Sequence, residues 1–267
     1  MSGYAETVGS LREQFIDPFR PKPPVERVFD NGSISVISHY LLGKLTVVSY
    51  ILETNDNNIV LIDSGVDSEG VGIKAIIGDK TIKAVANTHS DKDHINGHAI
   101  LTPGAAVYAH QNELDVISGN RRSDGLLQAA YNFFTKSTNT IDGLNLIPTY
   151  DGMEDRVDDI DLRFFNAEGH TTGSQVILAK KAQDEKYHLY TGDAAILYRD
   201  GVFRAAPWFL DHKHKVAQTN MSDVIRKILR SGHRIADGLA VHTGHSASGT
   251  FEQLANSYGV SLEKELH

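Results

Sequence analysis

Cysteine is absent from all 267 residues of the chain. Disulfide bonds, thiolate metal sites and a cysteine nucleophile are therefore excluded. Any metal ion must be held by nitrogen and oxygen atoms. The sequence also lacks a run of the roughly 18 apolar residues that a membrane helix requires. Its first stretch, MSGYAETVGSLREQF, has no apolar segment of signal-peptide length. We therefore expect a cytoplasmic protein that does not enter a membrane.

Basic charge is scarce as well. The chain has 26 lysine and arginine residues against 34 aspartate and glutamate residues, which gives a net charge of −8. Because binding to a phosphate backbone requires a basic surface, nucleic acid is not expected as a partner. We expect a small-molecule substrate instead. The oligomeric state cannot be read from the sequence. Histidine, by contrast, is abundant, with 13 residues that cluster along the chain.

The order of predicted elements is β-rich, α, β-rich, α, which favours two sheets covered by helices on the outside. The predicted strands cover residues 25–29, 34–38, 45–53, 59–62, 81–86, 106–108, 162–167, 175–179, 187–191 and 238–241. The predicted helices cover residues 68–77, 95–101, 112–117, 126–135, 223–229 and 250–257, with Asp124 and Ser222 as caps. Residues 136–158 are expected to be irregular. We predict an arm at residues 1–24 and a single domain at 25–267.

The segment NTHSDKDHINGH, residues 87–98, contains the pattern H-x-D-x-D-H. Its members are His89, Asp91, Asp93 and His94, and it lies between a predicted strand and a predicted helix. At such a junction alternate side chains can converge on one point, whereas the neighbours at 93 and 94 point apart. Two metal ions a few ångströms apart are therefore geometrically natural. The alternative is a polar loop with a solvated cluster of charges.

Three further segments place a candidate ligand beside a glycine at the end of a predicted strand. They are Gly169-His170, Gly192-Asp193 and Gly244-His245. Glycine permits a tight turn and a close approach of the backbone. A side chain at the end of a strand is held by a rigid scaffold and remains open to a substrate.

The order H-x-D-x-D-H, G-H-T-x-G, G-D and G-H resembles the metallo-β-lactamase-fold superfamily. Asp63, in the phrase Val-Leu-Ile-Asp-Ser-Gly, matches the first motif of that family, so five motifs extend from residue 63 to residue 245. The segment Val107-Tyr-Ala-His110 resembles segments that members of the glyoxalase II-like branch often have, so the resemblance is closest to that branch. The resemblance implies an α/β (α+β) fold, a four-layer αββα sandwich, with a dinuclear site at one edge of the sheets.

The same resemblance implies a ligand set for two divalent metal ions. The first metal would take His89, Asp91 and His170, and the second would take Asp93, His94 and His245. Asp193 would bridge the two ions. Asp63 would lie outside the ligand set and orient a ligand or the backbone. A variant of this interpretation fills only the second site, because Asp91 binds its metal poorly.

Asp91 departs from the common family motif, H-x-H-x-D-H. Two divalent ions are balanced by three aspartates and a bridging hydroxide, so the centre is neutral, whereas a histidine at 91 would leave one positive charge. Carboxylate oxygen suits manganese and iron better than a nitrogen donor does. The extra anion also raises the pKa of a bound water. Di-iron flavodiiron proteins of the superfamily carry glutamate at this position, so iron and manganese are as credible as zinc.

We expect a metal-dependent hydrolase in which a metal-bound hydroxide attacks a small ester, thioester, lactone, amide or phosphoester. Asp93 would also hold the proton for the leaving group. The alternative is an iron-dependent oxidoreductase, either flavodiiron-like or thiol dioxygenase-like. A flavodiiron reductase would need a flavin domain, for which residues 246–267 are too short. A ligand-binding relative without catalysis is disfavoured, because the ligand set is complete.

Several residues near these motifs keep an open role. His242 competes with His245 as the last ligand, and His98 is expected in a helix near the pocket. His110 is interpreted as a local structural residue, and Tyr198 as packing or pocket wall. The roles of His212 and His214, near Trp208 and Phe209, are undecided between an exposed polar stretch and a pocket lining. We expect residues 118–158 and 197–221 to determine the substrate.

Overall fold

The computed structural model describes residues 27–29, 34–41, 45–66, 70–101, 103–118, 144–184, 186–206, 213–231, 239–245 and 248–265. The arm predicted at 1–24, the helix predicted at 126–135 with its cap Asp124, and His212 lie outside the described residues. The division into an arm and one domain therefore stays a prediction.

The first sheet has seven strands in chain order. They are β1 (Arg27–Phe29), β2 (Ile34–Leu41), β3 (Leu45–Glu53), β4 (Asn58–Ile62), β5 (Thr81–Ala86), β6 (Ala106–His110) and β7 (Asn145–Thr149). The strands from β1 to β4 pair antiparallel, and those from β4 to β7 pair parallel. The parallel strands need crossover connections, which supply the helices α2 (Val71–Ile77), α3 (Lys92–Ile95) and α4 (Leu114–Ile117), with the short 3-10 turns η3 (Asn96–Ile100) and η4 (Gln111–Glu113).

The second sheet has the strand order β15-β14-β11-β10-β9-β8. Its strands are β8 (Glu154–Val157), β9 (Ile160–Asn166), β10 (Gln175–Lys181), β11 (His188–Gly192), β14 (Ala240–Thr243) and β15 (Gly249–Thr250). Only β11 and β14 pair parallel within it. Between them the chain forms a small ribbon, β12 (Ile196–Leu197) with β13 (Phe203–Arg204), and the long helix α6 (His214–Arg230). Helices α7 (Phe251–Ser257) and α8 (Leu262–Glu265) follow β15.

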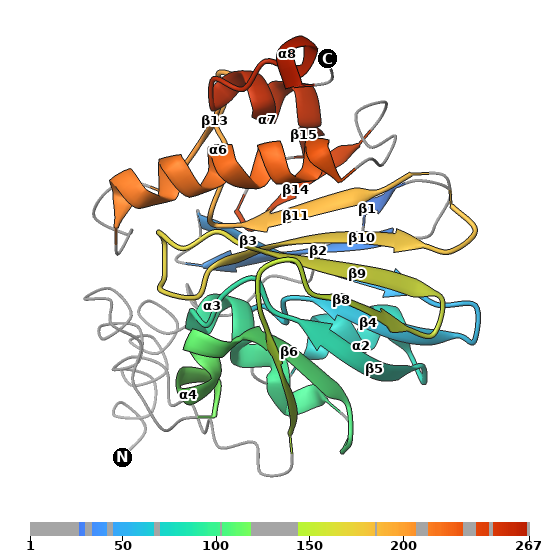
Figure 1. Ribbon diagram of the computed structural model, residues 1–267. Helices are drawn as coiled ribbons and strands as arrows, with labels where there is room; N and C mark the ends of the chain where they lie inside the picture. Colours follow the sequence, from blue (N-terminus) through green and yellow to red (C-terminus); the bar gives the residue numbers. More distant parts are fainter. Residues whose placement is uncertain are drawn as a thin grey trace, which may run out of the picture.

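Alternation along the strands divides the core into three layers of side chains. Val60 and Ile62 of β4 pack against Leu162 and Phe164 of β9 between the two sheets. Side chains on the opposite face of β4, such as that of Leu61, pack toward α2 and α3. The outer face of the second sheet packs against α6 and α7. Figure 1 shows α6 and α7 on one side of the sheets and α3 and α4 on the other. The predicted four-layer αββα sandwich is therefore confirmed.

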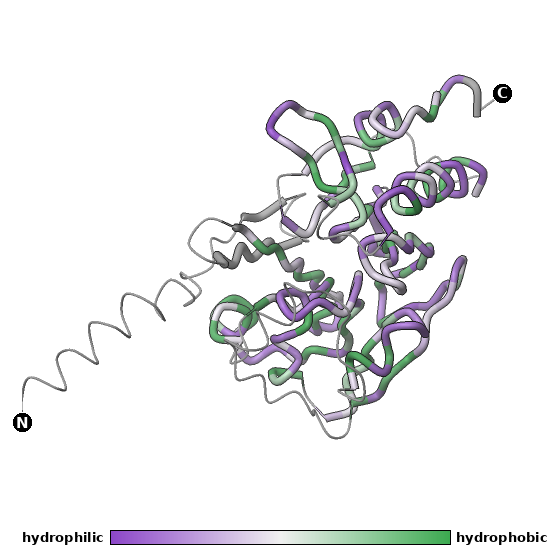
Figure 2. The backbone as a smooth tube through the Cα atoms, turned by 90° about the vertical axis from the view of Figure 1, so that its left-hand side faces the viewer, coloured by the Kyte–Doolittle hydropathy of each residue, from purple (hydrophilic) through white to green (hydrophobic). Residues whose placement is uncertain are grey.

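No helix in the described part of the chain combines the length and the apolar character needed to cross a membrane. Figure 2 shows hydrophobic and hydrophilic residues alternating along the elements, as expected for strands and helices with one buried face.

Three predictions about elements were wrong. Residues 136–158 contain two strands, β7 and β8, where we expected irregular chain. Helix α6 begins at His214 and not at residue 223, so Ser222 lies inside the helix and is not its cap. The helix expected after His94 begins earlier, at Lys92, and changes to a 3-10 turn at Asn96.

Candidate metal centre

The H-x-D-x-D-H segment supplies four side chains at the end of the first sheet. His89 follows β5 by three residues, and Asp91 immediately precedes α3, at its N-cap position. Asp93 and His94 lie within α3. The polypeptide changes from an extended to a helical path between Asp91 and Asp93, which turns the four side chains toward one region.

The second sheet supplies three more side chains at the same edge. His170 follows β9, Asp193 directly follows β11, and His245 follows β14. The backbone N–H of Gly244 donates to the carbonyl of Gly192 at 2.9 Å, which holds the ends of β11 and β14 together. The structure thus brings all seven predicted ligands to one place, from four strand ends and both sheets.

The first cluster consists of His89, Asp91 and His170, whose candidate ligand atoms lie within 4.8 Å of one another. The Asp91 Oδ2 atom is 3.1 Å from Nε2 of His170 and 3.7 Å from Nε2 of His89. This is the set predicted for the first metal.

The second cluster consists of Asp93, His94 and His245, within the same 4.8 Å limit. The two imidazoles face each other through their Nε2 atoms at 3.4 Å. Asp93 Oδ2 lies 3.6 Å from Nε2 of His245 and 4.0 Å from Nε2 of His94. This is the set predicted for the second metal.

Asp193 lies between the two clusters. Its Oδ2 atom is 2.9 Å from Nε2 of His245 and 3.6 Å from Nε2 of His170, so one oxygen reaches a histidine of each cluster. Its Oδ1 atom is 3.4 Å from Nε2 of His94. The position is the one expected of a bridging carboxylate.

Asp63 stands behind the ligands and holds them in place. Its Oδ1 accepts a hydrogen bond from the Thr88 backbone N–H at 2.7 Å, and its Oδ2 accepts from Nδ1 of His94 and from the Thr88 hydroxyl, both at 2.8 Å. The Thr88 hydroxyl lies 3.0 Å from Nδ1 of His89, and Nδ1 of His245 donates to the Thr46 carbonyl at 2.6 Å. Because Nδ1 is engaged in each ring, Nε2 is the atom that faces the centre.

Burial and the aspartates set the protonation of the metal-free centre in opposite directions. Burial lowers the pKa of His89 to about 3. Burial alone would also lower the pKa of His94, but Asp193, Asp63 and Asp93 outweigh it and raise that pKa to about 10. His245 and His94 in turn hold the pKa of Asp193 well below its usual range, against the effect of burial. Metal ions and protons therefore compete for the same nitrogen and oxygen atoms.

The residues present fit a pair of divalent metal ions. The donors are four imidazoles and three carboxylates, which suits zinc, iron or manganese. Among the described side chains, buried atoms without a hydrogen-bond partner include Nε2 of His89 and Oδ1 of Asp193, and both belong to the cluster. Buried polar atoms normally have a hydrogen-bond partner, so two such atoms without one, where candidate ligands converge, fit a cation that they would bind.

Glu113 is a buried residue of this region that the sequence analysis missed. Only 2% of it is exposed, and it contacts Ser90, Thr171 and Gly173 beside the first cluster. A glutamate in a short helical segment is normally exposed, so the sequence carries no signal for this burial.

Of the residues whose role the sequence left open, those that the structure describes lie outside the ligand clusters. His242 is buried in β14, where it hydrogen-bonds to His188 at 3.0 Å and to Ser248 at 2.8 Å. His98 lies in η3, with its Nε2 atom 2.9 Å from Oδ1 of Asn87. His110 accepts a hydrogen bond from the backbone of Asn112 and caps η4, which agrees with the predicted structural role. His214 begins α6, and Tyr198 packs under the guanidinium of Arg204.

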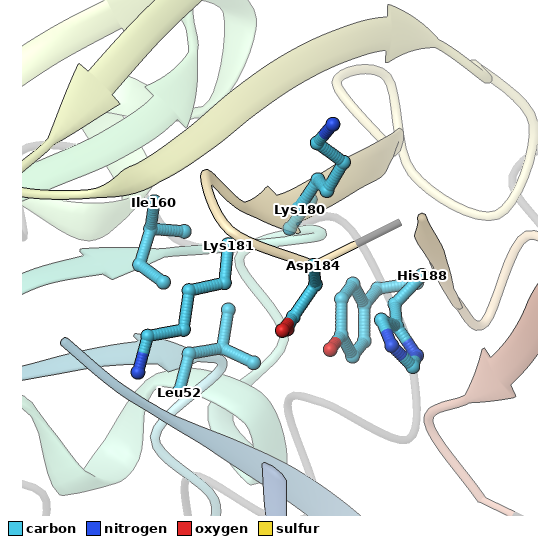
Figure 3. A pocket seen from close by; sticks show the side chains of 8 residues that line it. Leu52, Ile160, Lys180, Lys181, Asp184 and His188 are labelled. Carbon is cyan, nitrogen blue, oxygen red and sulfur yellow. The ribbon is translucent and has the colours of Figure 1, made fainter. Parts of the chain in front are cut away.

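A small pocket lies at the opposite end of β11 from Asp193. It is shown in Figure 3 and has a volume of about 10 Å³, which is room for about one water molecule. Its lining includes Lys180, Lys181, Asp184 and His188, together with Leu52 and Ile160. The pocket is too small for a substrate.

Solved structures share this fold at low sequence identity. A B3 metallo-β-lactamase, described as the first with an active-site glutamic acid, is 19% identical with a TM-score of 0.60 and covers 97% of this chain and 94% of its own. DIM-1 metallo-β-lactamase is 13% identical with a TM-score of 0.61 and covers 92% and 99%. A flavoprotein from Thermotoga maritima is 14% identical with a TM-score of 0.56 and covers 90% and 61%.

No curated protein sequence matches the chain. The sequence model of the metallo-beta-lactamase superfamily matches residues 42–235, which is more than half of the chain and includes Asp63, the H-x-D-x-D-H segment, His170 and Asp193. Together with the αββα sandwich, this match shows that the chain belongs to the metallo-β-lactamase superfamily.

Proposed function

We propose that the protein is a hydrolase with two divalent metal ions. The first would be held by His89, Asp91 and His170, and the second by Asp93, His94 and His245, with Asp193 shared between them. Membership of the superfamily supports a function of the metal-dependent hydrolase type. The observation that carries the proposal is the convergence of these seven side chains in overlapping clusters at one edge of the sheets.

The bound metals would supply a Lewis acid and a source of hydroxide at neutral pH. The protein's own residues hold and orient the reacting groups. Asp63 fixes the ring of His94, and the Thr46 carbonyl fixes the ring of His245. Asp93 is the carboxylate that we propose to hold the proton for the leaving group, because its side chain is the most exposed of the second cluster, at 16% against 10% for His245 and 0% for His94.

Asp91 gives the two clusters the same donors, because each has two imidazoles and one carboxylate and both share Asp193. Two histidines and one carboxylate are a set that suits iron(II) as well as zinc. The B3 metallo-β-lactamase named above carries an active-site glutamic acid by its own description, so a carboxylate in an active site of this fold has a precedent. We therefore propose zinc, iron or manganese.

For the substrate we propose a small ester, thioester, lactone or phosphoester, as in the glyoxalase II-like branch. The net charge of −8 supports a small molecule over a nucleic acid.

An iron-dependent oxidoreductase is the second candidate, and the matching donor sets of the two clusters favour it. The flavoprotein from Thermotoga maritima has the same fold. The matched region spans 90% of this chain and 61% of that protein.

Metal analysis followed by an activity panel tests the proposal. The protein is purified without added metal, its metals are identified and counted, and esters, thioesters, lactones and phosphodiesters are assayed with the metal found. We expect two metals per chain, one of which is lost in Asp91→Ala but kept in the control Asp115→Ala, which changes an exposed carboxylate on α4. One zinc per chain that Asp91→Ala leaves unchanged would contradict the dinuclear centre. Two irons with oxygen consumption and no hydrolysis would favour the oxidoreductase.

A further inference from the structure

Glu113 has a buried carboxylate that the proposed reaction does not use. It lies in η4, just after β6, and is 2% exposed. Its Oε1 accepts hydrogen bonds from the Thr171 hydroxyl at 2.5 Å and from the Gly173 backbone N–H at 2.7 Å. Its Oε2 accepts from the Ser90 hydroxyl. A carboxylate removed from water is costly unless such donors satisfy it, so three donors from two loops indicate a built arrangement.

The three donors lie next to the ligands of one metal site. Ser90 stands between His89 and Asp91, and Thr171 follows His170. One carboxylate therefore ties together the two loops that carry the whole first cluster. The second cluster is held differently, because the ring of His94 is fixed by Asp63 and that of His245 by Thr46.

The packing around Glu113 leaves little freedom for either loop. A Cβ atom at Gly173 would lie 2.4 Å from Cγ of Glu113, so only glycine allows this approach. Thr171, one of the three donors, is itself held by Ser174. The two hydroxyls lie 2.9 Å apart, and the Ser174 hydroxyl accepts a hydrogen bond from the Thr171 backbone N–H at 2.9 Å. The separation between Asp91 and His170 thus depends on a carboxylate outside both clusters.

We propose that Glu113 is a positioning residue of the first metal site. It sets the spacing of the Asp91 and His170 loops, and through them the affinity of the first metal, and has no effect on the second. This inference rests on the proposed two-metal function. Replacing a partner of this kind outside the ligand set typically costs about 10-fold to 100-fold in metal affinity.

The test is a titration of the metal-free protein with Co²⁺, followed by its visible absorption and by equilibrium dialysis. Glu113→Gln keeps the size of the side chain and replaces one acceptor oxygen by an NH₂ group. We expect the first Co²⁺ affinity to fall about 10-fold to 100-fold and the second to stay unchanged. Asp115→Asn is the matched control, since it neutralises an exposed carboxylate two residues away and should bind both ions as the unmodified protein does.

Two backgrounds assign the loss to a site. In the Asp91→Ala background, where the first site is already damaged, Glu113→Gln should leave the Co²⁺ affinity of the remaining site unchanged. In His245→Ala, where the second site is damaged, it should weaken the remaining Co²⁺. Ser90→Ala removes one of the three donors with less risk to folding, and it should weaken the same site in the same direction.

The outcomes separate this inference from the proposed function. If the unmodified protein binds no Co²⁺, the proposed function fails. If it binds two ions, and Glu113→Gln and Ser90→Ala bind both as tightly, only the role of Glu113 is overturned. Equal weakening of both sites with a lower melting temperature of the metal-free variant would also overturn it, because a purely structural brace gives that result.

Discussion

Asp91 supplies an anionic oxygen where the common family motif has an imidazole. Its Oδ2 atom lies 3.1 Å from Nε2 of His170 and 3.7 Å from Nε2 of His89, so this oxygen points into the first cluster. Burial would raise the pKa of Asp91, but the hydrogen bond from His170 and the charges of the nearby histidines lower it. The carboxylate is therefore ionised at neutral pH and open to a metal.

Replacing Asp91 by histidine should change which metal the protein retains. Asp91→His restores a neutral nitrogen donor and leaves the centre one charge more positive, so the fraction of zinc should rise against manganese and iron. Elemental analysis after growth in medium containing all three metals measures the ratio. Asp91→Asn is the control, because it removes the charge without adding an imidazole and should lower the total metal instead. An unchanged ratio in Asp91→His would show that residue 91 does not select the metal.

His98 should make the metal-free protein less stable in mild acid. Burial lowers the pKa of His98 to about 4, with Asp63 opposing and Lys92 reinforcing the effect. A histidine with a folded pKa below its unfolded value of about 6.5 binds fewer protons when folded, so unfolding free energy falls as pH drops from about 6.5 to about 4. His98→Gln should reduce the slope of the unfolding free energy against pH, between about pH 4 and 6.5, by up to about 1.4 kcal/mol per pH unit.

The measurement is denaturant unfolding of the chelated protein at several pH values. His214→Gln removes an imidazole from the start of α6 and serves as the control. A slope in His98→Gln equal to that of the unmodified protein would assign the acid sensitivity to other buried histidines, such as His242, whose pKa burial lowers to about 3.

At the scale of elements, the strand ends are packed too tightly to accept one more methyl group near the ligands. A Cβ atom at Gly244, after β14, would lie 2.4 Å from Oδ1 of Asp193 and 2.7 Å from Cε1 of His94. We expect Gly244→Ala to displace these ligands and weaken metal binding about 10-fold to 100-fold, the range for disturbed ligand partners. Metal content after dialysis measures the loss.

Gly201→Ala is the control for that substitution. Gly201 has a φ of +79° and nothing within 4 Å of an added Cβ, so its cost is backbone strain of about 1 kcal/mol. It should therefore lower stability and leave metal content unchanged. If Gly244→Ala binds metal as well as Gly201→Ala does, the close packing at the end of β14 does not position the centre.

The sequence predicted strands in the middle of the first sheet better than edge strands and the first residues of helices. Strands β3 and β5 match their predicted bounds, because their residues alternate or form apolar runs. β7 was missed because it contains Pro148, which a sheet accepts only at an edge such as this one. β8 is a short polar edge strand. Ser222 is a residue type that commonly caps helices, which explains its prediction as the cap of α6. Its hydroxyl instead donates to the Gln218 carbonyl inside the helix, a contact that the sequence does not reveal.

The sequence also indicated which side chains would lie close together at the candidate site, whereas their role as metal ligands stays a prediction. All seven predicted ligands lie together because each follows a strand that ends at the same edge of the fold. Glu113 was missed, since its burial depends on loops that are far apart in the sequence and meet only in the folded chain. Metal identity and substrate do not follow from the residues, because the donors accept several metals and the segments expected to contact a substrate lie partly outside the described residues.

At the scale of the whole molecule, the candidate metal centre draws its residues from both sheets. Four of the candidate ligands follow a strand of the first sheet. The other three, His170, Asp193 and His245, follow strands of the second sheet. Metal ions bound here would add to the contacts between the two halves of the chain, which also meet through the central apolar layer and through hydrogen bonds such as that from Tyr50 of β3 to the Thr243 carbonyl of β14 at 2.7 Å.

Removing metal should therefore lower the melting temperature of the entire domain. An ion present at 100 times its dissociation constant stabilises the folded state by about 2.7 kcal/mol per site. For two sites in a chain of this size, the shift is about 10 to 20 °C. Calorimetry with and without a chelator measures it, and His170→Ala should lose about half of the gain because it damages one site. A protein shown to hold two metals that melts at the same temperature after chelation would contradict this prediction, because the ions would then bind the unfolded chain as tightly as the folded one.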